Sequence, residues 1–170
     1  GQGIPFQSQV RMLRGSKLDQ PINDAIESLW HQWSYAEYCH TGGKLCFSDI
    51  ERLLIRSIAE SGEVFVRLVK QSFSGSPIPL ALEIIEADQL DDGLNGRSLQ
   101  GNEIRMGVEV DRWGRPIAYH FLAYHPGDYQ FSNQQISSQR HNRVLAADVI
   151  HLYRMDRPGQ TRGATWFASA

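Results

Sequence analysis

Carboxylates and imidazoles are the side chains of this sequence that are best suited to bind a metal ion or to act as an acid or base. The carboxylates gather in one segment, at Glu83, Glu86, Asp88, Asp91 and Asp92. A calcium loop needs oxygen ligands at alternate positions and a glycine at the bend, and Leu90 interrupts that spacing. The pattern therefore favours a solvated strand end and loop over a metal site, with Glu86 and Asp88 capping or holding the loop.

The six histidines do not form a recognisable catalytic or metal-binding pattern. They are His31, His40, His120, His125, His141 and His151. No two of them lie four residues apart on an expected helix, as a zincin motif requires. His151 alternates with Ile150 and Leu152 on an expected strand, so we predict that it points away from them and forms a structural hydrogen bond. A catalytic base would need a partner, and the sequence identifies none.

The cysteines and the glycine-rich segments also form no recognisable catalytic, metal-binding or nucleotide-binding pattern. Cys39 and Cys46 flank a loop that also contains His40, which is one ligand short of a zinc site. We favour two ordinary thiols, with a disulfide or a metal site as alternatives. Gly42-Gly43-Lys44 lacks the spacing of a phosphate-binding loop, and neither a dinucleotide fingerprint nor a Gly-x-Ser-x-Gly elbow occurs. We therefore predict no catalytic residue, no cofactor and no metal.

Size and charge limit the remaining possibilities. The 170 residues suit one domain or, alternatively, two small ones, and with 41% hydrophobic residues a proper core is expected. With 17 basic and 19 acidic side chains, tight nonspecific binding of nucleic acid by this segment is not expected. No apolar run is long enough to span a membrane, and no secretory signal is present at the N-terminus. The first residues and the uncapped run 164–170, which resembles the start of a helix, suggest a piece of a longer protein.

Two helices are expected within residues 21–61. The first, about Pro21 to Tyr38, has an apolar stripe that includes Trp30 and Trp33, and Asp19 is its expected cap. We expect both tryptophans in the core. The second helix, about 49–61, follows a Ser48/Glu51 capping box and ends at Gly62 as a left-handed cap.

A β-rich part of about 63–153 follows these helices. Its expected strands are 63–70, 80–86, 104–110, 117–122 and 149–153, with a long loop at 91–102 and a hairpin turn at 111–114. Helices that precede a run of strands indicate an α+β fold. We predict N-terminal helices followed by a mostly antiparallel β-sheet or a small barrel.

Four stretches occur in an order that resembles the lambda-type portal proteins of tailed bacteriophages and their prophages. They are GEVFVRL (62–68), LEIIEADQLDD (82–92), MGVEVDRWGRPIAYHFLAYHPGD (106–128) and VLAADVIHLYRMDRPGQTRGATWFA (144–168). The last stretch is the most specific, because it contains His-Leu-x-Arg and Arg-Pro-Gly-Gln-x-Arg-Gly. The loops 91–102 and 130–142 fit no family pattern.

The resemblance implies a structural subunit and not an enzyme. The chain would form one wing-region domain, with stem, clip and crown outside it. The full-length protein would form a homo-oligomeric ring, usually of twelve copies, at one capsid vertex of the virion, after assembly in the host cytoplasm. Double-stranded DNA would pass through this ring, and terminase, capsid and head–tail connector proteins would bind it. The alternatives are another phage assembly or connector protein and, less favoured, a small metal-dependent hydrolase or nuclease that uses Asp88 or His151.

The family motifs also suggest residues with structural or interface roles. They are Gly62, Glu63, Glu86, Asp88, Trp113, Gly114, His151, Arg157, Pro158, Gly159, Arg162 and Gly163. We expect Gly163 at the corner between wing and stem, in a conformation or close contact that a side chain would prevent. Arg154, Arg157 and Arg162 indicate a solvated loop or, alternatively, an ionic contact to a neighbouring subunit.

Overall fold

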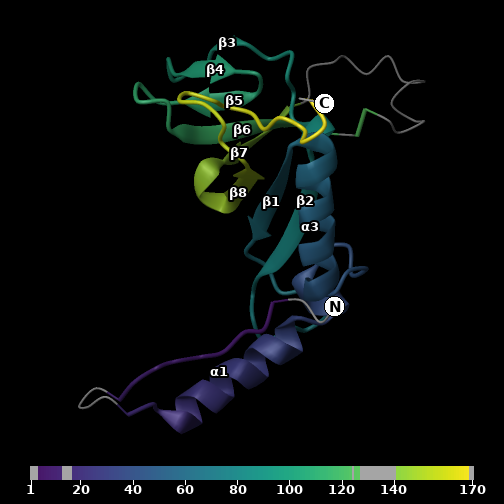
Figure 1. Cartoon of the computed structure of the whole chain (residues 1–170), viewed down its shortest axis with the longest axis vertical. Coiled ribbons are helices and arrows are strands. Elements are labelled where there is room, and N and C mark those ends of the chain that lie inside the picture. Colours follow the sequence, from purple (N-terminus) through teal and green to yellow (C-terminus); the bar gives the residue numbers. More distant parts are fainter. Residues whose placement is uncertain (1–3, 13–16, 124, 127–140, 169–170) are drawn as a thin grey trace. The chain divides into compact units, whose positions relative to one another are not determined.

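A computed structural model describes residues 4–12, 17–123, 125–126 and 141–168 (Figure 1). The elements are α1 (Gln20–Trp33), α2 (Ala36–Cys39), α3 (Phe47–Ser61), β1 (Glu63–Val69), β2 (Ala81–Glu86), η1 (Ala87–Gln89), β3 (Gly96–Arg97), β4 (Glu103–Arg105), β5 (Val108–Val110), β6 (Pro116–Leu122), β7 (His141–Leu145), η2 (Ala146–Asp148) and β8 (Val149–Tyr153). The chain divides into two compact units. The first unit contains Gly1–Leu54 and Leu68–Glu83, and the second contains Ile55–Arg67 and Ile84–Ala170.

Helix α1 begins as predicted and ends earlier than predicted. The Asp19 carboxylate accepts a hydrogen bond from the Ile22 backbone N–H at 3.5 Å, so the expected cap is confirmed. The helix ends at Trp33 and not at Tyr38, since Tyr35 is extended and the short helix α2 follows it. The Ser34 hydroxyl donates to the His31 carbonyl at 2.7 Å. Such a local bond competes with the helical backbone pattern and is typical of a helix end.

The apolar stripe of α1 is only partly buried. Trp33 is in the core, and its indole N–H donates to the Leu80 carbonyl at 2.6 Å. Trp30 is half-buried, and Ile22 and Leu29 are nearly half exposed. The prediction of a core position is thus confirmed for Trp33, whereas the stripe as a whole is not covered within the described part of the chain. Periodicity identifies the apolar side of a helix but does not identify what packs against it.

Helix α3 begins at Phe47, one residue before the predicted cap. The Ser48 capping box is therefore wrong, because Ser48 lies inside the first turn. Glu51 instead accepts a hydrogen bond from the Ile4 backbone N–H at 3.1 Å. At the other end, Gly62 has a φ of 90°, which confirms the predicted left-handed cap.

The strands form two open antiparallel sheets. One has the order β2-β1-β8 and the other the order β3-β4-β5-β6-β7. The α+β class is confirmed. The small barrel is wrong, because no strand ladder among the described residues closes either sheet on itself.

The predicted strand 104–110 is a hairpin. Met106 and Gly107 have φ values of 47° and 81°, so the chain reverses between β4 and β5. Positive φ at both central residues matches the tight turns of two-residue hairpins. The predicted long loop 91–102 contains β3, which pairs with β4. A strand of two residues is too short to show the alternation of apolar and polar residues that predicts a strand, so only its pairing with a neighbour identifies it.

Strands of both sheets supply the core of the second unit. Its members are Phe65, Ile85, Leu90, Val108, Val110, Tyr119, Phe121, Val144 and Val149. The Phe65 ring lies edge-on to Tyr119 and Phe121, with centroid distances of 5.5 Å and 5.2 Å. Such edge-to-face pairs add to the stabilisation from apolar burial. None of the described helices is long and apolar enough to cross a membrane.

Candidate functional site

A buried carboxylate at the first residue of β1 connects the last strand to the C-terminal segment. Glu63 is 2% exposed, and its Oε2 lies 2.9 Å from His151 Nε2. The same oxygen accepts a hydrogen bond from Gly163 N at 2.6 Å, and Oε1 accepts one from Arg162 Nε at 2.5 Å. We call Glu63, His151, Arg162 and Gly163 the Glu63 network. All four residues belong to the second unit.

The pairing of β1 with β8 brings Glu63 and His151 together. Glu63 lies opposite Tyr153 in this antiparallel ladder, so His151 is a diagonal neighbour on the same face. The His151 ring stacks on Phe65 with a centroid distance of 4.2 Å. Ile150 is exposed while the His151 side chain is almost fully buried, as expected from the alternation along the strand. His151 therefore lies at a structural hydrogen-bonding position.

Arg162 connects the network to two other parts of the second unit. In addition to Glu63, its guanidinium donates to the Met106 carbonyl at the β4–β5 turn and to the Ala87 carbonyl in η1, both at 3.3 Å. A guanidinium has five N–H donors in a fixed planar arrangement, so one arginine can donate to acceptors in several segments of the chain. The solvated-loop interpretation is wrong for Arg162, because its side chain is mostly buried and pairs with Glu63 of the same chain. The alternative, an ionic contact to a neighbouring subunit, stays a prediction.

Two glycines let the C-terminal segment pass close to the α3–β1 junction. A Cβ on Gly163 would overlap the Gly62 carbonyl oxygen and would lie 2.7 Å from the Glu63 Cβ. A Cβ on Gly62 would lie 2.5 Å from the Thr165 backbone N. The predicted close contact at Gly163 is confirmed. The sequence predicted Gly62 as a helix cap and as a structural or interface residue, but it did not predict that Gly62 contacts the C-terminal segment.

The electrostatics of the network keep Glu63 ionised. Burial raises the pKa of the Glu63 carboxyl, but the hydrogen bond to His151, the charge of Arg162 and the Gly163 N–H outweigh it and hold the pKa below its ordinary value. Both carboxylate oxygens are occupied by partners from the chain. This arrangement fixes the path of the backbone at Gly163.

Sequence reasoning missed the residue that shapes the turn before Arg162. The Gln160 side chain accepts hydrogen bonds from the Asp156 and Arg157 backbone N–H groups and donates to the Arg162 carbonyl. The Gln160 backbone carbonyl accepts a hydrogen bond from the Tyr153 hydroxyl at 3.1 Å. Arg157, Pro158 and Gly159 form the exposed part of this turn, as the solvated-loop interpretation predicts.

The segment after this turn does not continue as the predicted helix. Residues 166–168 form a turn in the described part of the chain. The Trp166 backbone N–H and the Thr165 hydroxyl both donate to the Ala59 carbonyl, at 3.3 Å and 3.2 Å. These bonds tie the segment to the last turn of α3. Tertiary contacts have therefore replaced the local helical pattern.

The remaining candidates lie outside the Glu63 network. The Glu86 side chain caps η1, which confirms that expectation, and it lies 3.0 Å from His125 Nε2. Asp88 is exposed in the first turn of η1. Trp113 and Gly114 form the exposed β5–β6 turn, where Gly114 has a φ of 79°.

Metal chemistry finds no support in the arrangement of the described residues. Among them, no group of three or more His, Cys, Asp or Glu side chains is placed to hold an ion. Cys39 is buried, Cys46 is half-buried, and both are free thiols. Burial raises the pKa of Cys39 to about 11, which disfavours the reactive thiolate.

A second buried carboxylate lies on β5. Glu109 is fully buried and accepts hydrogen bonds from Arg143 Nε and Asn102 Nδ2, both at 2.8 Å, and His120 Nε2 is 3.4 Å away. The Arg143 hydrogen bond, with smaller help from Asn102 and Ser98, lowers the pKa of Glu109 to about 2 against the effect of burial. Sequence reasoning missed this group, whose only signal is a charged residue between two valines on an expected strand.

Acid is expected to destabilise the protein through Glu109. Because its folded pKa is depressed, its contribution is complete above the ordinary value of 4.5 and is lost as the pH falls towards about 2. The lost contribution over this whole range is about 3 kcal/mol. Urea denaturation of wild type and Glu109→Gln from pH 7 to pH 3 tests this. The variant should have a lower free energy of unfolding at pH 7, and this free energy should depend less on pH than that of the wild type. An equal pH dependence in the two proteins would contradict the role of Glu109.

Comparison with known proteins shows similarity to phage portal proteins. The model of the phage portal protein family, lambda type, matches residues 1–170. A probable portal protein of Halomonas phage phiHAP-1 is 36% identical over 164 residues. The match covers 96% of this chain and 30% of that relative, so the chain spans less than a third of the relative's length.

Proposed function

Because the chain belongs to the lambda family of phage portal proteins, we propose that it forms the wing region of a structural subunit at one capsid vertex. The observation that carries this proposal is the family match along all of residues 1–170. The geometry supports a structural role, since the polar atoms of the Glu63 network bind one another and the backbone. The proposed role is not catalytic and needs no cofactor.

The full-length protein would act as a ring. Closed rings use heterologous contacts, in which one patch of a subunit meets a different patch of the next. Family resemblance suggests about twelve copies, a channel for DNA during packaging and ejection, and docking of terminase, capsid and head–tail connector proteins. A formal net charge of −2 suits the wall of a conduit, because a strongly basic wall would retain DNA. Assembly would take place in the host cytoplasm and the product would reside in the virion.

Within this subunit, the Glu63 network would set the direction in which the chain leaves the wing. Arg162 and Gly163 are held against the start of β1, and Thr165 is held against the end of α3. Such a fixed exit would transmit the orientation of the wing to a following stem. In this proposal, residues 1–170 are one wing region, and Gly163 marks its corner.

The ring proposal is tested with the complete protein that the gene encodes. We expect electron microscopy to show rings with a central hole and light scattering to give a mass of about twelve subunits. Residues 1–170 by themselves should be monomeric or weakly associated, which provides the control. A compact monomer of the complete protein, under conditions in which portal rings assemble, would contradict the proposal.

A further inference from the structure

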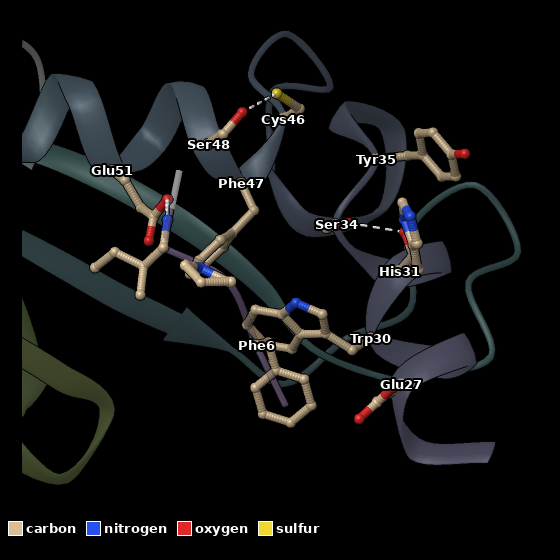
Figure 2. Close-up of a pocket in the computed structure, with 12 residues that line it drawn as sticks. Phe6, Glu27, Trp30, His31, Ser34, Tyr35, Cys46, Phe47, Ser48 and Glu51 are labelled. Carbon is tan, nitrogen blue, oxygen red and sulfur yellow. Dashed lines mark hydrogen bonds between the residues drawn. The ribbon is translucent and has the colours of Figure 1, made fainter. Parts of the chain in front are cut away.

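The first unit contains an open pocket of about 470 Å³ that the Glu63 network does not involve (Figure 2). Residues from 4–6, α1 and the start of α3 line it. The volume lies in the range of roughly 300–1,000 Å³ that is typical of ligand sites. It is therefore large enough to take side chains of a partner.

Aromatic rings form the base of this pocket. Trp30 stacks on Phe6 with a centroid distance of 4.7 Å, and Phe47 lies edge-on to Trp30 at 4.9 Å. His31 and Tyr35 stack at 6.3 Å beside them, and Tyr35 is exposed. Aromatic faces that are partly accessible attract other aromatic rings and cations.

Two glutamates flank the rings. Figure 2 shows Glu27 and Glu51 on opposite sides of Trp30. Each uses one carboxylate oxygen to accept a backbone hydrogen bond, from Ser8 N at 3.0 Å and from Ile4 N at 3.1 Å. None of the twelve described lining residues is a lysine or arginine. The pocket is thus aromatic and acidic, which favours a cationic, aromatic occupant.

The chain itself carries a segment with that chemistry. The β5–β6 turn, residues 111–115, exposes Trp113 to 74%, and the Arg112 guanidinium lies 5.1 Å from the centre of the Trp113 ring. Arg115 is also exposed. Asp111 Oδ1 accepts hydrogen bonds from the Trp113 and Arg115 backbone N–H groups, both at 2.8 Å, which hold this carboxylate inside the turn. The turn thus carries two guanidinium charges against one carboxylate charge. We call residues 111–115 the basic tip.

We propose that the basic tip of one copy inserts into the aromatic, acidic pocket of the next copy. Trp113 would stack against the aromatic base, and Arg112 and Arg115 would face Glu27 and Glu51. Tip and pocket are different patches of the same chain, so the contact is heterologous and can repeat around a closed ring. This inference rests on the proposed ring and identifies one of its subunit contacts.

A native thiol in the pocket permits a direct test by cross-linking. Cys46 lines the pocket, so a cysteine on the tip, Arg115→Cys, should form disulfides between copies of the complete protein under mild oxidation. We expect a ladder of linked subunits on a denaturing gel. The ladder should vanish when Cys46→Ser is added. Arg157→Cys, on another exposed turn of the second unit, provides the matched control and should give no ladder.

Affinity gives an independent measurement. Buried tryptophans are frequent hot spots of interfaces, so Trp113→Ala should raise the protein concentration needed for half-maximal ring assembly at least tenfold. Arg112→Glu should weaken assembly similarly, and Glu27→Arg should partly restore it in the double variant. Since Trp113 is exposed, its replacement should leave subunit unfolding unchanged.

The outcomes separate this inference from the proposed function. Normal rings with no Cys46-dependent ladder, and with no effect of Trp113→Ala, would overturn the tip contact while leaving the ring proposal intact. Disulfide cross-linking of the basic tip to a different virion protein, without cross-linking between copies of this chain, would also overturn the proposed tip contact. If the wild-type protein forms no rings, both proposals fail.

Discussion

Replacing Glu63 with alanine is expected to lower the free energy of unfolding by about 3–5 kcal/mol, because removal of one member of a buried ion pair leaves its partner charged and unsatisfied. Arg162 and His151 would both lose their carboxylate partner, and the Gly163 N–H would lose its acceptor. Urea denaturation at pH 7, followed by circular dichroism, measures the change.

The control is a carboxylate with an arginine partner at the surface. Glu103 pairs with Arg105 at 2.9 Å, but both side chains are about half exposed. Surface pairs contribute little to stability, so Glu103→Ala should change it only slightly. Glu63→Gln, which keeps the shape and one acceptor oxygen, should fall between wild type and Glu63→Ala. If Glu63→Ala and Glu103→Ala have equal effects, the Glu63 network does not stabilise the fold.

Replacing Gly163 with valine is expected to cost about 3 kcal/mol or more, at the upper end of the usual range for overpacking. The first added carbon would already overlap the Gly62 carbonyl, and that group is backbone at the end of α3, which cannot rotate away as a side chain could. In the complete protein, the same change should impair ring assembly, since the C-terminal segment could not lie against β1.

Gly93 provides the matched glycine. A Cβ there would meet its nearest atom, an Asp91 carboxylate oxygen, at an ordinary distance of 3.4 Å. Gly93→Val should therefore be tolerated in both the denaturation and the assembly measurements. Equal stability and equal ring yield for Gly163→Val and Gly93→Val would show that the segment can move away from the α3–β1 junction at little cost.

Local features could be predicted from the sequence because their causes lie within a few residues. Asp19 caps α1 through a contact three residues away, and Gly62 ends α3 through its own backbone angle. Apolar residues recur every three or four positions in the first part of the chain and every second position after Gly62. This local change in spacing indicated the α+β class. The Ser48 cap failed because the helix begins at Phe47, two residues before the predicted start at residue 49, and local sequence signals do not define a helix end to within two residues.

The tertiary structure decided which residues form the Glu63 network. His151 is 88 residues from Glu63 in the sequence, Arg162 is 99 and Gly163 is 100. The local sequence around each of them does not indicate a contact with Glu63. Their meeting depends on the pairing of the first long strand with the last, and the alternation of a strand does not specify its partner. The family match and the local elements thus come from sequence, whereas the buried ion pairs exist only where the fold brings distant charges together and excludes water.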